Sequence, residues 1–218
     1  AKKEGVTKTV IRANVDRNGA VTLRGDIPKG AINPIVEVNY EDNRNPIDVG
    51  RYAKAVVSKL QEKYGFTKMN MVGHSLGNMS ILYYLLEHAQ DENLPQLQKQ
   101  VNIANFVAGL EAMGLSSDVK VDKTTGQPNQ ITQTFQRLLP LREVFPQNQI
   151  DVLNIYGDYK NGSDGSVLNA SSRSLKYLVA DNAKSYQEKK ITGKLAQHSQ
   201  LHENPEVDKI LIQFLWGK

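Results

Sequence analysis

Apolar and polar positions in the first third of the chain repeat with two different periods. Residues 7–15 and 20–27 are rich in β-forming side chains, and the Asn18-Gly19 pair between them is a strong hairpin signal. Residues 35–40 form another β-like run. Residues 48–64 instead repeat apolar side chains about every four positions, as an amphipathic helix does, and Gly65 suits its left-handed end. The pattern predicts a hairpin, a strand and a long helix.

Strand-like and helix-like segments keep alternating through the rest of the chain. Further strands are expected at 68–72, 101–107, 150–156 and 185–192. Helices are expected at about 76–88, 131–139 and 171–179, and over the last residues, where apolar side chains recur from Val207 to Leu215. This alternation predicts an α/β fold, with a mainly parallel sheet flanked by helices and an N-terminal hairpin. A length of 218 residues without internal repeats suits a single domain.

A G-x-S-x-G motif joins the strand at 68–72 to the helix that follows it. The motif reads Gly73-His74-Ser75-Leu76-Gly77. In this nucleophile elbow, a strained turn lifts the serine hydroxyl out at the carboxyl end of the sheet, and glycines let neighbouring chains approach. Ser75 is therefore the predicted nucleophile. The backbone N–H of Leu76, at the start of the helix, is the predicted oxyanion donor.

Two carboxylates compete to be the acid of a triad. In α/β-hydrolases the order along the chain is serine, acid, histidine, and the acid follows a late strand. Asp158 lies just after the strand expected at 150–156, and Asp164 lies further along the same loop, in a Ser-Asp-Gly-Ser-Val stretch like that of many lipase-like hydrolases. Aspartate before glycine is also an ordinary turn former. We favour Asp164 and keep Asp158 as the alternate.

Two histidines compete to be the base. His198 and His202 both lie between the last strand and the last helix, where this superfamily places its histidine. The stretch around His198 resembles the histidine loop of small bacterial lipases. We favour His198 and keep His202 as the alternate. His74, Asn105 and Phe106 are expected to line the substrate pocket, because sites in such sheets lie at the carboxyl ends of strands.

A long segment, residues 108–149, separates two expected core strands. Connections in compact domains seldom exceed about six residues, and longer ones tend to be lids or binding loops. Its helix-like part carries Phe135, Leu138 and Leu139. We therefore expect a lid-like insertion, with Phe106 and residues 131–141 bordering the cavity above the serine. The alternative is a surface insertion packed away from the site.

Composition narrows the classes of protein that the chain can represent. Hydrophobic residues make up 39% and charged residues 23%, which is ordinary for a globular protein with a core. The absence of cysteine excludes disulfides, thiolate metal sites and a cysteine nucleophile. The net charge of +4 comes from scattered lysines, which indicates a solvated surface or weak attraction to an anionic cell wall. We find no nucleic-acid motif and no transmembrane segment.

Five stretches spanning nearly the whole chain carry a family resemblance. They are residues 33–40, 72–78, 153–158, 169–175 and 196–204. Together they resemble the uncharacterised cell-surface hydrolases of Gram-positive bacteria. The resemblance implies an α/β-hydrolase fold, a lipase- or esterase-like site, and a secreted or surface location, although a chain without cysteine fits the cytosol as well.

The resemblance also predicts a missing part. Members of the family carry an upstream strand that ends in a His-Gly segment, whose loop supplies part of the oxyanion hole. No His-Gly pair occurs in this sequence. We therefore expect these residues to belong to a longer protein that includes this strand and loop.

The sequence thus predicts a serine hydrolase that cleaves a small or lipid-like ester through Ser75, Asp164 and His198. This chemistry needs no metal or organic cofactor. One rival is a non-catalytic surface-binding protein that keeps the hydrolase fold. Another is a different acyl chemistry on the same triad, as in a peptidase, thioesterase or acyltransferase.

Overall fold

The computed structural model describes all residues from 1 to 218, and its strands form two sheets. A four-stranded sheet has the order β4-β5-β6-β7 and is parallel throughout. A three-stranded sheet has the order β2-β1-β3, with β1 antiparallel to β2 and parallel to β3. The strands are β1 (Val10–Val15), β2 (Val21–Arg24), β3 (Ile35–Tyr40), β4 (Lys68–His74), β5 (Gln96–Ile103), β6 (Asp151–Asp158) and β7 (Ser185–Thr192).

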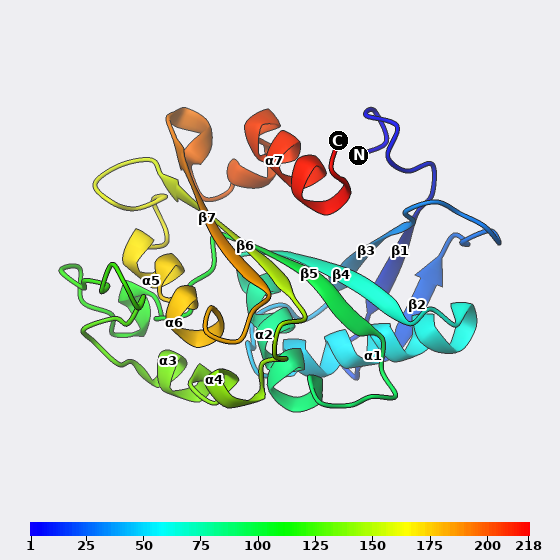
Figure 1. Cartoon of the computed structure of the whole chain (residues 1–218), viewed down its shortest axis with the longest axis horizontal. Coiled ribbons are helices and arrows are strands. Elements are labelled where there is room, and N and C mark those ends of the chain that lie inside the picture. The colour runs from blue at the N-terminus through cyan, green and yellow to red at the C-terminus, as the bar shows by residue number, and fades with distance from the viewer.

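Helices cover both faces of the four-stranded sheet. The helices are α1 (Asp48–Tyr64), α2 (Leu76–His88), α3 (Gln133–Leu138), α4 (Leu141–Val144), α5 (Asn169–Arg173), α6 (Leu175–Val179) and α7 (Pro205–Trp216), with short 3-10 turns η1 (Glu111–Met113), η2 (Lys194–Ala196) and η3 (Leu201–Glu203). Helices α1 to α6 lie on one side, whereas α7 lies on the other, close to both chain termini (Figure 1). A membrane could not be spanned by any of these helices, because none combines enough length with enough apolar character.

Two hydrophobic cores follow from the alternation of side chains along the strands. The larger core lies between the sheets and α1 to α6, and includes Tyr52, Leu82 and Phe135. The smaller core lies under α7, where Val101 on β5 and Leu153 on β6 meet the helix. A parallel sheet that is buried on both faces is the usual arrangement when strands alternate with helices.

The fold agrees with the α/β architecture and the N-terminal hairpin that the sequence predicts. The chain turns at Gly19, whose φ is 86°, and Val15 then pairs with Val21. The sequence does not predict helix α4, and two other elements differ from prediction in their extent or continuity. Strand β5 spans Gln96–Ile103 rather than 101–107, because Ala104 adopts a φ of 52° and ends it. The helix expected at 171–179 is two helices that meet at Ser174, whose hydroxyl donates to the Ala170 carbonyl.

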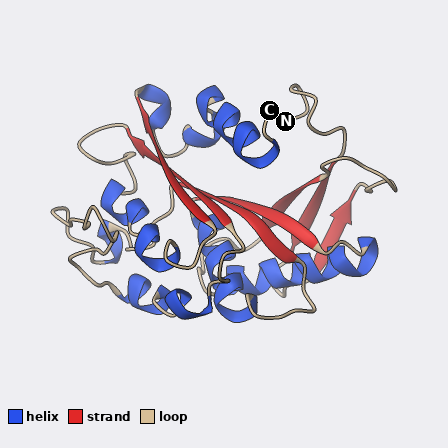
Figure 2. Ribbon diagram, in the orientation of Figure 1, coloured by secondary structure: helices blue, strands red, loops and turns tan.

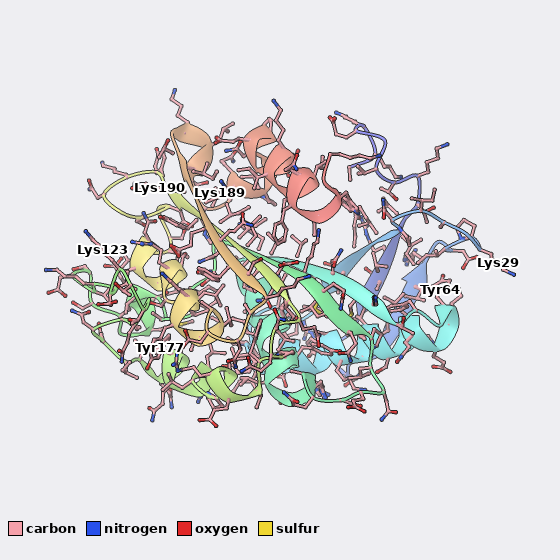
Figure 3. The ribbon with its side chains drawn as sticks, viewed as in Figure 1. Lys29, Tyr64, Lys123, Tyr177, Lys189 and Lys190 are labelled. Carbon is pink, nitrogen blue, oxygen red and sulfur yellow. The ribbon has the colours of Figure 1, made fainter.

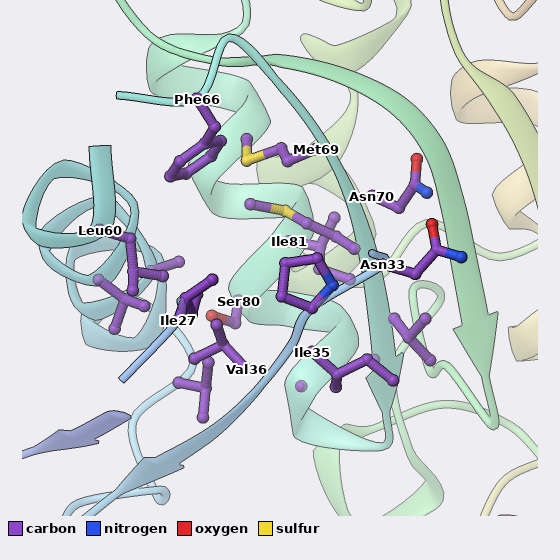
Figure 4. A pocket seen from close by; sticks show the side chains of 18 of the residues that line it. Ile27, Asn33, Ile35, Val36, Leu60, Phe66, Met69, Asn70, Ser80 and Ile81 are labelled. Carbon is purple, nitrogen blue, oxygen red and sulfur yellow. The ribbon is translucent and has the colours of Figure 1, made fainter. Parts of the chain in front are cut away.

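A cavity of about 1180 Å³ separates the two sheets. Strands β3 and β4 are the facing edges, and they do not pair with each other (Figure 2). We call this cavity the inter-sheet slot. Side chains from both strands project into it, among them Ile35 and Val36 of β3 and Met69 and Asn70 of β4 (Figure 4).

Valines in the middle of both edge strands are exposed because of the slot. Val38 is 45% exposed and Val72 is 48% exposed. Strands with such apolar residues are normally covered when they lie inside a sheet. The exposed edges therefore mark an opening in what would otherwise be one continuous sheet.

The packing of α1 on α2 can be tested at Gly50. Alanine is a better helix former than glycine by about 1 kcal/mol. However, a Cβ at this position would lie 2.6 Å from the Tyr83 Cβ on α2, and overpacking costs about 1–3 kcal/mol. We expect Gly50→Ala to lower the free energy of unfolding by about 1–2 kcal/mol, measured by urea denaturation. Lys59→Ala, on the exposed side of α1, is the control. A stabilised Gly50→Ala variant would show that the two helices are more loosely packed.

Candidate active site

Ser75 occupies a strained turn between β4 and α2. Its φ is 52° and its ψ is −119°, a conformation that costs a residue with a side chain about 1–3 kcal/mol. Gly73 makes the turn possible, because a Cβ there would lie 2.8 Å from the Asn78 amide nitrogen and from the Gly77 carbonyl. A Cβ at Gly77 would meet nothing within 4 Å. The close approach of α2 to the end of β4 therefore requires a glycine at position 73 but not at position 77.

Three of the predicted side chains form a continuous hydrogen-bonded row. The Ser75 Oγ lies 2.9 Å from His198 Nε2, and His198 Nδ1 lies 2.8 Å from Asp164 Oδ2. Asp164 is only 1% exposed. Its other carboxylate oxygen accepts the backbone N–H groups of Ser166 at 2.9 Å and Val167 at 2.7 Å. These bonds satisfy a buried charge that would otherwise be costly.

The main chain of His198 is held as firmly as its ring. Its N–H donates to the Asp164 carbonyl at 2.9 Å, and its carbonyl lies 2.8 Å from His74 Nε2. Both ring nitrogens and both backbone groups of His198 therefore have partners. With its ring held at two points and its backbone at two more, His198 has little freedom to turn away from the serine.

The two alternate residues are bonded elsewhere. Asp158 lies 2.9 Å from Lys190 Nζ and accepts the Gly162 N–H. The hydrogen bond from Lys190 to Asp158 and the charge of the Asp158 carboxylate raise the pKa of Lys190. His202 stacks on His74 and lies 3.9 Å from a Glu203 carboxylate oxygen. Neither Asp158 nor His202 is hydrogen-bonded to Ser75 or to the His198 ring.

Three buried amides that sequence reasoning missed support the elbow from inside. Asn78 donates to the carbonyls of Ser75 at 2.9 Å and Ile103 at 2.8 Å. Asn102 donates to Asn78 at 3.1 Å, and Gln100 donates to Asn102 at 2.8 Å. All three amide side chains are fully buried. Asn78 could have been noticed because it directly follows the motif at the start of a mainly apolar helix, whereas Gln100 and Asn102 lie in a mostly polar strand and nothing in the sequence singles them out.

The three residues expected to line the substrate pocket lie in different surroundings. His74, Ser75 and Leu76 line the inter-sheet slot, but Asn105 and Phe106 do not. Asn105 is fully buried and donates to Asn154 at 2.7 Å, and Phe106 packs in the larger core. The positive φ of Ala104 ends β5 just before them, so they lie in the core and not at the cleft.

The segment 108–149 contributes no residue to the lining of the slot. Its helices α3 and α4 pack against α2 and α6. Phe135, Leu138 and Leu141 are fully buried in the larger core. The lid role that we expected for this segment therefore draws no support from the cavity beside Ser75.

Leu76 is the first residue of α2, so its N–H has no partner within the helix. No group of three or more His, Cys, Asp or Glu side chains is placed to hold a metal ion. Lys29, Lys123 and Lys189 point from different parts of the surface (Figure 3).

Comparisons with known proteins support the architecture. The family described as "Alpha/beta hydrolase of unknown function (DUF915)" matches residues 1–218. The lin2722 gene product from Listeria innocua superposes with a TM-score of 0.89 and 28% identity, over 99% of this chain and 85% of that chain. A proposed cell surface hydrolase from Lactobacillus plantarum WCFS1 superposes with a TM-score of 0.79 and 23% identity, over 99% of this chain and 82% of that chain. No protein with a curated description matches the chain in sequence.

The different surroundings of the two motif glycines can be tested directly. Gly73→Ala places a methyl group against backbone atoms that cannot move aside, so we expect a loss of about 2 kcal/mol in unfolding free energy. Gly77→Ala adds a methyl group in open space within a helix, so stability should be unchanged or rise by up to about 1 kcal/mol. Thermal and urea unfolding of the two variants measure the difference. A Gly77→Ala variant less stable than Gly73→Ala would contradict this account of the turn.

Proposed function

The chain belongs to a family of α/β-hydrolases of unknown function, and on that basis we propose that it is a serine hydrolase that cleaves carboxylic esters. The observation that best supports this proposal is the hydrogen-bonded row from the Ser75 hydroxyl through His198 to the buried Asp164 carboxylate. Serine, base and acid in this mutual arrangement are recognised by geometry and role, whatever the surrounding fold.

In the proposed reaction, His198 acts as the base. Its Nε2 accepts the proton of Ser75 as the serine oxygen attacks the ester carbonyl. Asp164 holds the imidazole in the correct tautomer and stabilises the imidazolium that forms. Two backbone N–H groups already bind the other Asp164 oxygen, so the carboxylate stays in place as charge develops on the ring.

The negative charge that develops on the carbonyl oxygen needs donors. We propose the Leu76 N–H as one donor, aided by the positive end of the α2 dipole. His198 then returns the proton to the leaving alcohol, which leaves an acyl-serine. A water molecule activated by His198 releases the acid and restores the serine.

The slot that borders Ser75 is mainly apolar, with 18 hydrophobic residues among the 32 that line it. We propose a small or lipid-like ester as the substrate, because Leu76 and Gly77, which follow Ser75 in this lining, carry no charge. The Lactobacillus plantarum protein bears the name of a cell surface hydrolase. We extend that location to this chain as part of the proposal, with only weak association to the anionic wall.

We also propose that one further parallel strand fills part of the slot. In a parallel strand, successive residues direct their backbone groups to opposite sides. The N–H of Ile35 donates to Thr9, just before β1, that of Glu41 donates to the end of β1, and that of Ser75 donates to β5. The N–H groups of Val36, Val38 and Val72 therefore point into the slot. A strand between β3 and β4 would form hydrogen bonds with the backbone groups that both strands direct into the slot. Its carboxyl end would bring a second backbone donor close to Ser75.

Substitution of the triad tests the proposed reaction. Ser75→Ala and His198→Ala should each remove nearly all ester hydrolysis, because members of a triad act as a unit. His202→Ala should have a milder effect. The readouts are hydrolysis of nitrophenyl esters and covalent labelling of Ser75 by a fluorophosphonate, with thioester and peptide substrates to sort the chemistry. An inactive His202→Ala beside an active His198→Ala would reverse the assignment of the base.

The added strand is tested by extending the chain with the upstream segment that the family resemblance predicts. We expect kcat to rise by about 10²–10³, the usual effect of one oxyanion donor. Hydrogen exchange at the amides of Val36, Val38 and Val72 should slow at the same time. The Leu82 amide, within α2, is the internal control and should be protected in both forms. Equal exchange at the three valines with and without the segment would rule out this strand.

A further inference from the structure

His74 joins two parts of the site that are otherwise linked only by the reacting atoms. It is the last residue of β4 and the neighbour of Ser75. Its Nε2 lies 2.8 Å from the backbone carbonyl of His198. A carbonyl oxygen only accepts hydrogen bonds, so Nε2 is the nitrogen that carries the hydrogen. The strand that carries the serine therefore donates a hydrogen bond to the loop that carries the base.

The other bonds to His198 come from a different part of the molecule. Asp164 binds the His198 ring and also its N–H, but both residues lie on loops after β6 and β7. Asp164 and His198 can thus shift together relative to Ser75. Apart from the Ser75–His198 bond itself, the His74 contact is the hydrogen bond that fixes this loop to β4.

Two further imidazoles enclose the His74 ring. The His202 ring stacks on it with centroids 4.8 Å apart and planes 7° from parallel. The His198 ring lies 5.1 Å away, tilted by 41°. Burial lowers the pKa of His74, and the charges of His198 and His202 lower it further, while the His198 carbonyl and Asp164 act in the opposite direction. A neutral His74 puts no like charge beside His198 when that ring becomes an imidazolium.

From these contacts we propose that His74 is a positioning residue, which sets the distance between Ser75 and His198 by holding the His198 carbonyl. In this arrangement His202 covers the His74 ring and is not a second base. The inference rests on the proposed function for its kinetic consequence. Its structural part, the fixed orientation of His198, does not require turnover.

Two substitutions separate the hydrogen bond from the bulk of the ring. His74→Met replaces the ring by an apolar side chain of similar length that has no donor. In His74→Gln the terminal amide can still donate to the His198 carbonyl. We expect His74→Met to slow fluorophosphonate labelling of Ser75 by about tenfold to a hundredfold, since displacement by about 1 Å has effects of this size. His74→Gln should recover most of the rate. His88→Gln, at the far end of α2, is the control and should label like the parent chain.

The outcomes separate this inference from a general folding defect and from the proposed function. Circular dichroism and thermal unfolding verify that each variant is folded. Labelling of folded His74→Met at the parent rate, or equally slow labelling of His74→Gln, would overturn the positioning role. If the parent chain is not labelled at all, the proposed function fails. The inference is then decided by the proton NMR signal of His198 Nδ1–H, which should be sharp in the parent and in His74→Gln and broadened in His74→Met, and an unchanged signal in His74→Met would refute it.

Discussion

The positive φ of Ser75 is the constraint on which the rest of the site depends. With a φ of 52° the chain reverses between β4 and α2 in one residue, which points the hydroxyl away from both elements and towards His198. The conformation is costly, so neighbouring groups must hold it. Because Gly73 has no side chain, α2 can approach β4 closely. The side-chain amide of Asn78 donates to the Ser75 carbonyl beneath the turn.

The interior of the sheet is divided between apolar packing and this support. On the α7 side, Val101 and Leu153 form a conventional core. On the α2 side, Gln100 and Asn102 replace apolar residues and connect to Asn78. Buried amides cost about 1–3 kcal/mol when unpaired. These are paired at nearly every atom, although Gln100 Oε1 has no partner. The fold thus carries a polar network in its core where the serine turn must be held.

Much of the fold and part of the site could be predicted from local patterns. The periods of 2 and 3.6 residues locate β3 and α1, in which apolar side chains repeat along one face. The start of β5 could not be found in this way, because four of the five residues from Gln96 to Gln100 are polar and show neither period. The order of motifs identifies Ser75, Asp164 and His198 as candidates. By contrast, the burial of Asn105 depends on the φ of Ala104, which no residue pattern reveals.

The split between the two sheets divides the proposed chemistry into separable parts. Ser75, His198 and Asp164 all follow strands of the four-stranded sheet, so their mutual distances do not depend on β1 to β3. Leu76, in contrast, borders the slot where the two sheets face each other. The positioning of the proposed nucleophile and base is therefore complete within one sheet and α2. Stabilisation of the oxyanion depends in addition on what lies between β3 and β4. Preorganised donors stabilise the charge on the carbonyl oxygen, and free access of water weakens that stabilisation.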